Sequence, residues 1–348
     1  MMSKTRPTVA LIFGGRGYER EVSVRGADNL YRLIPKEMYD VTAVFIDPSG
    51  SFLSPECDAL PSQIARGEAP VREVYPIQRG GCGGLGFDGG FLPVDAAFPL
   101  LHGNFGEDGT VQGALECTGI GYVGCDTVAS GAARDKMTVK AIASVLGIPT
   151  LPGVLCQRGE VGEATARAEA LLGYPMFVKP TRLGSSIGAG VANNRRELRY
   201  ALEHALSLDG RAVIEKRIEI EKELECAYFA AGGKELVTSP GEILAHGFYD
   251  YDKKYRTTEA AVSECAAVSE SVAEAVREYA ARLVRAVGLR DLSRLDFFLS
   301  DEGEIYFNEI NTMPGFTESS LYLRLLEHAG IAPREAVSAL IDGALARG

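Results

Sequence analysis

The chain has 348 residues, of which 46% are hydrophobic and 24% charged, and its formal net charge is −11. This length and composition are typical of two or three globular domains and exclude a fibrous or disordered protein. The acidic balance disfavours nucleic acid as the main partner, and no apolar run is long enough to span a bilayer, so we expect neither partner.

The first predicted unit is a parallel α/β domain. Residues 8–13 form an apolar, β-branched run that ends at Gly14 and Gly15, and a helical pattern follows over residues 22–33. A strand, a glycine turn and a helix in this order are typical of a parallel sheet. Residues 80–90 contain seven glycines and are predicted to be a surface insertion. The other predicted elements are strands at residues 41–46, 94–101 and 121–123 and a helix at residues 108–118.

From about Asp135 the predicted elements form a more antiparallel α+β region. The clearest helix starts at Ser271 and Glu274, which have the spacing of a capping box, and it ends before Gly288. Residues 247–264 carry many charges without a clear period, which predicts a long loop. The other predicted elements are helices at residues 136–146 and 195–206, strands at residues 176–179, 212–216, 223–230 and 235–245, and a loop at residues 180–190.

Residues 293–311 predict a β-hairpin that carries metal-binding oxygens. Because side chains alternate along a strand, one row holds Arg294, Asp296 and Phe298, and the other holds Glu309 and Asn311. If Asp296 pairs opposite Phe307, both rows lie on one side of the sheet, with Asp296 and Glu309 as diagonal neighbours. Two carboxylates and an amide suit Mg²⁺ or Mn²⁺ bound together with a nucleotide's phosphates. The alternative is a solvated face with a salt bridge from Arg294.

A loop with three glycines and two serines follows a predicted strand, at residues 184–190. Such a loop lets the backbone bend closely over an anion, and Lys179 at the end of the strand is placed to contact a phosphate. The loop is not a P-loop, because no Gly-Lys-Ser/Thr follows, and it does not open the helix of a dinucleotide fingerprint. A flexible hairpin tip is the alternative.

Three other segments contain candidate ligand contacts. Lys136 opens a predicted helix and is a second basic group for phosphate, although a surface position would also explain it. The strand that ends at Glu215 and Lys216 can present its backbone to an adenine, with Glu215 or Glu223 available to a ribose, whereas a solvated strand end is the alternative. His102 follows a predicted parallel strand, at the end where such sheets bind ligands, and a structural histidine is the alternative.

Taken together, these segments resemble the D-alanine–D-alanine ligases of the ATP-grasp superfamily over nearly the whole chain. The motifs follow the family's order: Gly14-Gly15 with Glu19 to Ser23, His102-Gly103 with Glu107 to Gly109, Asp135-Lys136, Val178 to Pro180 with Gly184 to Gly188, Glu215-Lys216 with Glu223, Tyr249 to Tyr255, Arg294 to Asp296, and Asn308 to Gly315. Each motif alone is weak, whereas the ordered set is specific.

The resemblance implies an ATP-grasp fold, α/β and α+β, in three parts: an N-terminal parallel α/β domain at residues 1–135, a central subdomain at residues 136–212 and a C-terminal subdomain at residues 213–348. ATP would be held between the last two by Lys136, Lys179, Ser186, Glu215, Lys216, Ile218, Glu223 and Asn308, with Phe298 under the adenine. Two Mg²⁺ or Mn²⁺ ions would bind Asp296, Glu309 and Asn311. The residues implied for the substrates are Glu19, Ser185 and Tyr255 for the first D-alanine and Ser320 and Leu321 for the second, with His102 and Lys254 as further substrate-binding residues.

The implied reaction joins two D-alanines for peptidoglycan synthesis. The first carboxylate attacks the γ-phosphorus of ATP, and the amine of the second D-alanine attacks the resulting acyl phosphate. The metal ions and lysines would neutralise charge on the phosphoryl oxygens, and Arg294 with the Gly315 N–H would stabilise the oxyanion. Residues 248–264 would form a lid that excludes water.

Other functions remain open at this stage. A D-alanine–D-serine ligase is the alternative within the superfamily, because Tyr255 argues against D-lactate as second substrate but not against D-serine. A nucleotide-binding protein without catalysis is another, although intact Arg294, Asp296 and Glu309 argue against it. A biotin-dependent carboxylase fragment would share the ATP site, but the N-terminal domain and lid do not suit it. The resemblance further implies a homodimer, and the short polar start predicts a cytoplasmic protein.

Overall fold

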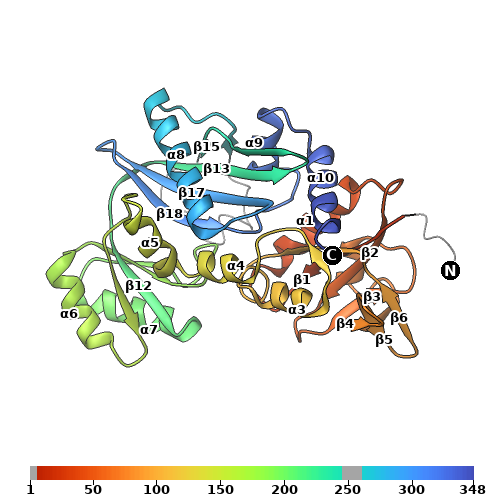
Figure 1. The fold of residues 1–348 in the computed structure, drawn as a ribbon. Helices are drawn as coiled ribbons and strands as arrows, with labels where there is room; N and C mark the ends of the chain where they lie inside the picture. Colours follow the sequence, from red (N-terminus) through yellow and green to blue (C-terminus); the bar gives the residue numbers. More distant parts are fainter. Residues whose placement is uncertain (1–5, 245–260) are drawn as a thin grey trace.

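The computed structural model describes residues 6–244 and 261–348. Within these ranges the strands form three sheets, and helices pack against each of them (Figure 1). None of the described helices is long and apolar enough to cross a membrane.

The first sheet lies in the N-terminal part of the chain and has the strand order β6-β5-β4-β3-β2-β1-β7-β8. Its parallel strands are β1 (Thr8–Gly14), β2 (Asp40–Ile46), β7 (Ala96–Leu101) and β8 (Gly121–Tyr122). The helices of this unit are α1 (Arg20–Leu33), α2 (Pro61–Ala65) and α3 (Thr110–Thr118). Every residue of β1 is buried, as expected for the centre of a parallel sheet covered on both faces. The predicted parallel α/β arrangement is confirmed.

The glycine-rich residues 80–90 were predicted to be a surface insertion, and this is wrong. The strands β3 (Phe52–Pro55), β4 (Val71–Arg79), β5 (Cys82–Phe87) and β6 (Gly90–Pro93) extend the first sheet in antiparallel fashion. Gly80 and Gly81 make the turn between β4 and β5, with φ angles of 61° and 83°. A Cβ on Gly84 would lie 2.4 Å from the Leu92 carbonyl oxygen, so this glycine permits close packing of paired strands.

The second sheet is antiparallel, with the order β11-β10-β12-β9. Its strands are β9 (Gly153–Gln157), β10 (Met176–Pro180), β11 (Gly190–Ala192) and β12 (Arg211–Lys216), and its helices are α6 (Val161–Leu171) and α7 (Arg195–Leu208). The two helices and the sheet enclose a separate core that includes Leu198, Leu202 and Ile214. The predicted strands at residues 176–179 and 212–216 are confirmed.

The third sheet has the order β16-β15-β13-β17-β18, with β14 paired to β13. Its strands are β13 (Ile220–Ala231), β14 (Lys234–Val237), β15 (Gly241–Ile243), β16 (Val262–Ser263), β17 (Leu292–Ser300) and β18 (Ile305–Asn311). Residues 235–245 were predicted as one strand, but the described part of this range, up to residue 244, contains two strands, β14 and β15, because Pro240 lies between them and has no N–H for the ladder. The helices α4 (Thr127–Arg134), α5 (Lys136–Val145) and α8 (Glu270–Val287) share a core with this sheet.

The start of α8 differs from the prediction by two residues. The N-cap is Ser269, whose Oγ accepts a hydrogen bond from the Val272 N–H at 3.4 Å. Ser271, the predicted cap, already lies inside the first turn. The predicted end is confirmed, because Gly288 has a φ of 76° and the left-handed conformation that stops a helix.

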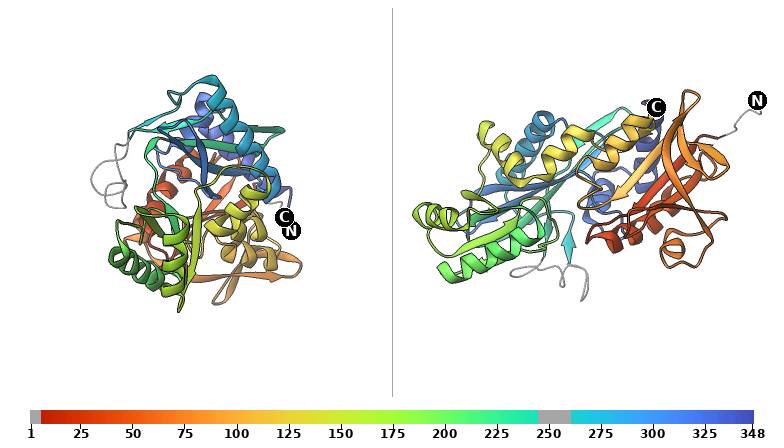
Figure 2. Two further views of the ribbon diagram at one scale, coloured as in Figure 1. Left: turned by 90° about the vertical axis from the view of Figure 1, so that its left-hand side faces the viewer. Right: turned by 90° about the horizontal axis from the view of Figure 1, so that it is seen from below.

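The C-terminal helices α9 (Leu321–His328) and α10 (Pro333–Leu345) return the chain to the first sheet (Figure 2). Val337, Leu340 and Ile341 of α10 are at most 1% exposed and share one hydrophobic core with β1, α1 and β7. Just beyond α10, Arg347 Nη2 donates to the Tyr122 carbonyl oxygen at 2.9 Å. The last helix therefore completes the core of the first sheet.

Candidate active site

A pocket lies between the second and third sheets. Its walls come from β10, β12 and the loop at residues 183–189, and from β13, β15, β17 and β18. All the residues predicted to bind ATP line it: Lys136, Lys179, Ser186, Glu215, Lys216, Ile218, Glu223, Phe298 and Asn308. The fold thus brings together, at one site, segments that are as far apart in sequence as α5 and β18.

Two buried lysines bring positive charge to this pocket. Lys136 is the first residue of α5, and its Nζ lies 3.0 Å from Glu309 Oε2 and 2.7 Å from the Leu183 carbonyl oxygen. Burial lowers the pKa of Lys136, and the nearby Glu309 carboxylate opposes that shift. Lys179 Nζ lies 3.1 Å from Asn308 Oδ1. Neither lysine is the surface residue that its sequence position alone would allow.

Glu215 is buried between two cations. Lys179 Nζ lies 2.8 Å from Glu215 Oε2, and Lys140 pairs with Glu215 Oε1. Burial raises the pKa of Glu215, but Lys179 and Lys140 together outweigh it and lower the pKa to about 2. The sequence analysis missed Lys140, although its position four residues after Lys136 places both on one face of α5.

The predicted hairpin at residues 293–311 is confirmed, but its register is not. Asp296 pairs directly with Glu309 rather than with Phe307, and a bulge separates that pair from the next. Phe307 is 0% exposed in the core, whereas Asn308 and Glu309 both line the pocket. The bulge therefore turns two successive side chains to one face. Direct pairing also brings Asp296 and Glu309 closer than the predicted diagonal would.

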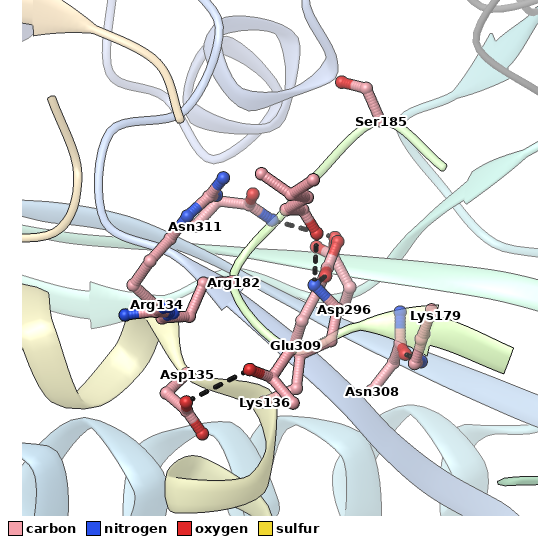
Figure 3. Close-up of polar contacts among 12 residues, drawn as sticks. Arg134, Asp135, Lys136, Lys179, Arg182, Ser185, Asp296, Asn308, Glu309 and Asn311 are labelled. Atoms are coloured by element: carbon pink, nitrogen blue, oxygen red, sulfur yellow. Dashed lines mark hydrogen bonds and ion pairs between the residues drawn. The ribbon is translucent and has the colours of Figure 1, made fainter. Parts of the chain in front are cut away.

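The Asp296 carboxylate is held by several donors. Arg294 Nε and Nη2 donate to its two oxygens, both at 2.8 Å, and Asn311 Nδ2 donates at 3.0 Å. Glu225 Oε2 on β13 lies 3.1 Å from Arg294 Nε, a contact that the sequence analysis did not predict. Figure 3 shows Asp296, Glu309 and Asn311 gathered below the loop that carries Ser185. The three predicted metal ligands thus meet on one face of the hairpin.

The oxygen donors of this face fit a divalent metal that binds together with a nucleotide. Asp296, Glu309 and Asn311 offer two carboxylates and an amide, and Mg²⁺ commonly completes such a set with phosphate oxygens and water. In residues 6–244 and 261–348, no three His, Cys, Asp or Glu side chains form a metal-binding cluster of their own. A metal at this face would therefore need the nucleotide for part of its coordination.

The loop at residues 184–188 has a strained backbone. Ser185 and Ser186 have φ angles of 53° and 57°, in the left-handed region that glycine favours. Such conformations are costly and cluster at functional sites. The Ser185 hydroxyl donates to Glu19 Oε1, so the loop contacts the N-terminal unit as well as the pocket. Two members of the predicted Glu19, Ser185 and Tyr255 trio are therefore in contact.

The turn between β1 and α1 positions Glu19. Ser23 in α1 is completely buried, and its Oγ accepts the Gly14 N–H at 2.8 Å and donates to the Leu100 carbonyl oxygen at 2.5 Å. These bonds tie the first turn of α1 to β1 and β7. Glu19, which directly precedes α1, is therefore fixed at the carboxyl ends of the parallel strands, where such sheets bind ligands.

The residues predicted for the second substrate lie after β18. A Cβ on Gly315 would lie 2.8 Å from Ser320 Oγ, and that oxygen accepts the Thr317 N–H at 3.0 Å. Leu321 begins α9, so Ser320 lies at a helix N-terminus, where N–H groups favour a carboxylate. His102 is buried, with Nδ1 3.1 Å from the Met313 carbonyl oxygen.

Two predicted residues cannot be placed. Lys254 and Tyr255 lie outside the described residues, as do residues 245–260 of the predicted loop and lid.

Comparison with known proteins now identifies the family. Residues 8–125 match the family model "D-ala D-ala ligase N-terminus", and residues 142–342 match "D-ala D-ala ligase C-terminus". This chain belongs to the D-alanine–D-alanine ligase family. It is 39% identical over 358 aligned residues to D-alanine–D-alanine ligase A of Mesorhizobium japonicum, covering 100% of this chain and 99% of the relative. It is 38% identical to the D-alanine–D-alanine ligase of Streptococcus pneumoniae R6, covering 97% and 96%.

Solved structures of the family support the same assignment. The VanG D-Ala:D-Ser ligase of Enterococcus faecalis superimposes with a TM-score of 0.87 at 32% identity, covering 97% of this chain and 99% of that one. The D-alanine–D-alanine ligase of Coxiella burnetii gives a TM-score of 0.83 at 26% identity, covering 98% and 94%. The ATP-grasp fold with an N-terminal parallel α/β domain is therefore confirmed for this member of the family, which is an ATP-using ligase acting on small molecules.

Proposed function

We propose that this enzyme joins two D-alanines to D-alanyl-D-alanine, with ATP converted to ADP and phosphate, as a step of peptidoglycan synthesis in the cytoplasm, where ATP is available. The observation that carries the proposal is the contact between Ser185 and Glu19. It connects the loop over the nucleotide pocket to a carboxylate that is suited to an amino-acid ammonium group. Family membership and relatives named D-alanine–D-alanine ligase support the choice of substrate.

The first step couples the nucleotide pocket to the first substrate. Glu19 would bind the ammonium group, and the substrate carboxylate oxygen would attack the γ-phosphorus, so that ADP leaves and an acyl phosphate forms. Lys136 and Lys179, both buried in the pocket wall, would neutralise phosphate charge. We propose that Tyr255, with Lys254, adds a further contact to this subsite.

The metal proposal uses the hairpin face. Asp296, Glu309 and Asn311 would hold two Mg²⁺ or Mn²⁺ ions together with the phosphates. When bound, such ions neutralise charge that develops on the phosphoryl oxygens. Arg294 donates to both carboxylate oxygens of Asp296, so Arg294 would orient this carboxylate before a metal ion binds.

The second step uses the segment after β18. The amine of the second substrate would attack the acyl carbon, and phosphate would leave. Arg294 and the Gly315 N–H would stabilise the oxyanion, while Ser320 and the first turn of α9 would hold the second carboxylate. His102 would support the same region from the first sheet.

A D-alanine–D-serine ligase is the second candidate. The observation that favours it is the TM-score of 0.87 with a structure described as a D-Ala:D-Ser ligase. The two candidates share the first step and differ only in the second substrate, so a single assay distinguishes them.

The test is a panel of D-amino acids with ATP and Mg²⁺ or Mn²⁺, read by dipeptide mass and by phosphate release. We expect D-alanyl-D-alanine as the main product and a higher kcat/KM for D-alanine than for D-serine as second substrate. A preference for D-serine would select the second candidate. Nucleotide binding without any D-alanine-dependent phosphate release would indicate a protein that has lost catalysis.

Two further points are part of the proposal. We propose a homodimer, by analogy with the family, which sedimentation of the purified protein tests. We also propose three structural parts at residues 1–135, 136–212 and 213–348, supported by the three separate sheets. Limited proteolysis near residues 135 and 212 tests those boundaries.

A further inference from the structure

The guanidinium group of Arg134, the last residue of α4, is buried between the first sheet and the loop at residues 184–188, which we call the serine loop. Its Nη2 lies 3.8 Å from Glu19 Oε2, and its Nη1 lies 3.5 Å from Glu107 Oε2. The side chain is only 9% exposed. Arg134 therefore contacts the carboxylate to which the proposed function assigns the first substrate's ammonium group, and it does not line the pocket between the second and third sheets.

Two glycines leave the space that this arginine occupies. A Cβ on Gly103 would lie 2.6 Å from Glu19 Oε2 and 3.5 Å from Arg134 Nη2. A Cβ on Gly184 would lie 3.3 Å from Glu19 Oε1 and 3.5 Å from Arg134 Nη1. The arginine and Glu19 thus lie together between the His102-Gly103 turn and the serine loop.

The arginine is not fully satisfied by this pairing. Its Nε and Nη2 have no hydrogen-bond partner in the described part of the chain, although both atoms are buried. An arginine that served only to stabilise the fold would be expected to use its donors, because buried unpaired donors are costly. Its contribution here is better explained by charge than by hydrogen bonds.

Glu107 is the second carboxylate that Arg134 contacts. Its carboxylate accepts the Gly103 N–H at 2.7 Å and the Met313 N–H at 3.2 Å, so it connects the first sheet to the segment after β18. Burial raises the pKa of Glu107, and the Arg134 guanidinium is the main group that opposes this shift, followed by His102. Without Arg134, two carboxylates would face one buried region with little compensation.

We propose that Arg134 is a positioning residue that balances Glu107, so that Glu19 alone presents one net negative charge to the ammonium group of the first amino acid. The inference rests on the proposed function, because it takes Glu19 as the ammonium site. With both carboxylates ionised, Glu19, Glu107 and Arg134 carry a formal charge of −1, from two negative groups and one positive group. That charge matches a single ammonium group.

The test isolates the first substrate. Hydroxylamine replaces the second amino acid and traps the acyl phosphate as a hydroxamate, so that the KM for D-alanine reports on the first subsite. In Arg134→Gln the carboxylates of Glu19 and Glu107 repel each other without compensation, so that they share a proton and Glu19 binds the ammonium group less well. We therefore expect this KM to rise about tenfold, while the KM for ATP changes by less than about twofold. Arg134→Lys keeps the charge and should restore most of the affinity.

A double variant distinguishes charge balance from packing. Glu107→Gln alone removes the net negative charge and should also weaken the first substrate, whereas Arg134→Gln with Glu107→Gln restores a single negative charge at Glu19. We expect the double variant to bind D-alanine better than either single variant. Arg211→Met is the control for local packing. Arg211 Nη1 pairs at 2.7 Å with Asp135, which lies between α4 and α5, so this variant removes another arginine near Arg134. It should leave the KM for D-alanine unchanged.

The outcomes are distinct. Additive losses in the double variant, or equal losses in the lysine and glutamine variants, would overturn the charge-balance role. If Arg134→Gln does not fold, the double variant and Arg134→Lys still give the comparison, and failure of all three to fold would show that Arg134 is a structural residue. Absence of D-alanine-dependent hydroxamate with the unchanged protein would contradict the proposed function instead.

Discussion

Lys136 Nζ lies 3.0 Å from Glu309 Oε2, and this pair joins the start of α5 to the end of the β17–β18 hairpin. The lysine is thus paired with a carboxylate that the proposed function assigns to a metal. Binding of a metal–nucleotide complex would let both groups exchange partners, since the carboxylate then faces a cation and the lysine faces a phosphate. The pair therefore keeps two ligand-binding groups compensated before the ligand arrives.

Lys136→Met should weaken ATP binding. It removes a buried cation from the pocket together with its contact to Glu309, so we expect the KM for ATP to rise about tenfold or more. The measurement is initial rate against ATP at saturating D-alanine. Lys234→Met removes an exposed pair with Glu335 and is the control, because such surface pairs contribute little. An unchanged KM for ATP in Lys136→Met would contradict the assignment.

Asp296→Asn should remove most turnover without unfolding the protein. The substitution keeps the shape of the side chain but removes the charge that faces Arg294 and the proposed metal. We expect kcat to fall by about a hundredfold or more and the activity to need more Mg²⁺. Near-normal turnover at the same Mg²⁺ concentration would refute the metal assignment. Circular dichroism of the variant checks that the fold is intact.

Ser185→Ala and Ser185→Gly separate the hydroxyl from the backbone strain. Both lose the bond to Glu19, so we expect each to raise the KM for the first D-alanine by about tenfold. Only glycine relieves the φ of 53°, so Ser185→Gly should be the more stable of the two. Hydroxamate trapping and thermal unfolding measure the two effects. A glycine variant less stable than the alanine variant would show that the backbone strain at this position is smaller than the entropy cost of glycine in the unfolded chain.

Lys140→Met should shift the acid unfolding of the protein to higher pH. Glu215 has a folded pKa of about 2, below the ordinary value of about 4.3 for an unfolded chain. A lowered pKa contributes stability that is present above the unfolded pKa and is lost as pH falls through the folded pKa. Without Lys140 the pKa of Glu215 rises, so that contribution shrinks and disappears at a higher pH.

The measurement is the thermal midpoint of Lys140→Met and of the unchanged protein, from about pH 6 to about pH 2.5. The midpoint of Lys140→Met should be the lower one near pH 6, it should begin to fall at a higher pH, and the gap between the two curves should narrow as pH falls towards the folded pKa of Glu215. In a Glu215→Gln background the same lysine substitution should produce no such pH-dependent gap. A shift that persists in that background would mean that Lys140 acts through another carboxylate.

The sequence predicted the elements whose pattern is local. The buried run of β1, the glycine stop of α8 and the turn of the β17–β18 hairpin each follow from a few neighbouring residues. The register of that hairpin did not follow, because a bulge at Asn308 changes the alternation and leaves no mark in the sequence. The prediction of a surface insertion at residues 80–90 was wrong because glycine suits a loop and a crowded strand equally.

The candidate site likewise contains residues that the sequence predicted and residues that only the structure revealed. The motifs predicted residues that line the pocket between the second and third sheets, and the structure brings them together. Lys140, Glu225 and Arg134 were missed because their roles arise from partners on other elements. Arg134 contacts Glu19 across 115 positions of sequence (134 − 19), and no periodicity relates such residues.

The placement of α10 in the core of the first sheet affects the order in which the protein matures. The strands of the first sheet leave the ribosome long before Leu340 and Ile341 of the same core, which follow the end of β1 by 326 positions (340 − 14). Until they arrive, a nascent chain exposes an uncovered apolar face, which is a target for chaperones. A chain truncated shortly before residue 333 would carry every proposed catalytic residue. It would still lack α10, the helix that completes the core of the first sheet.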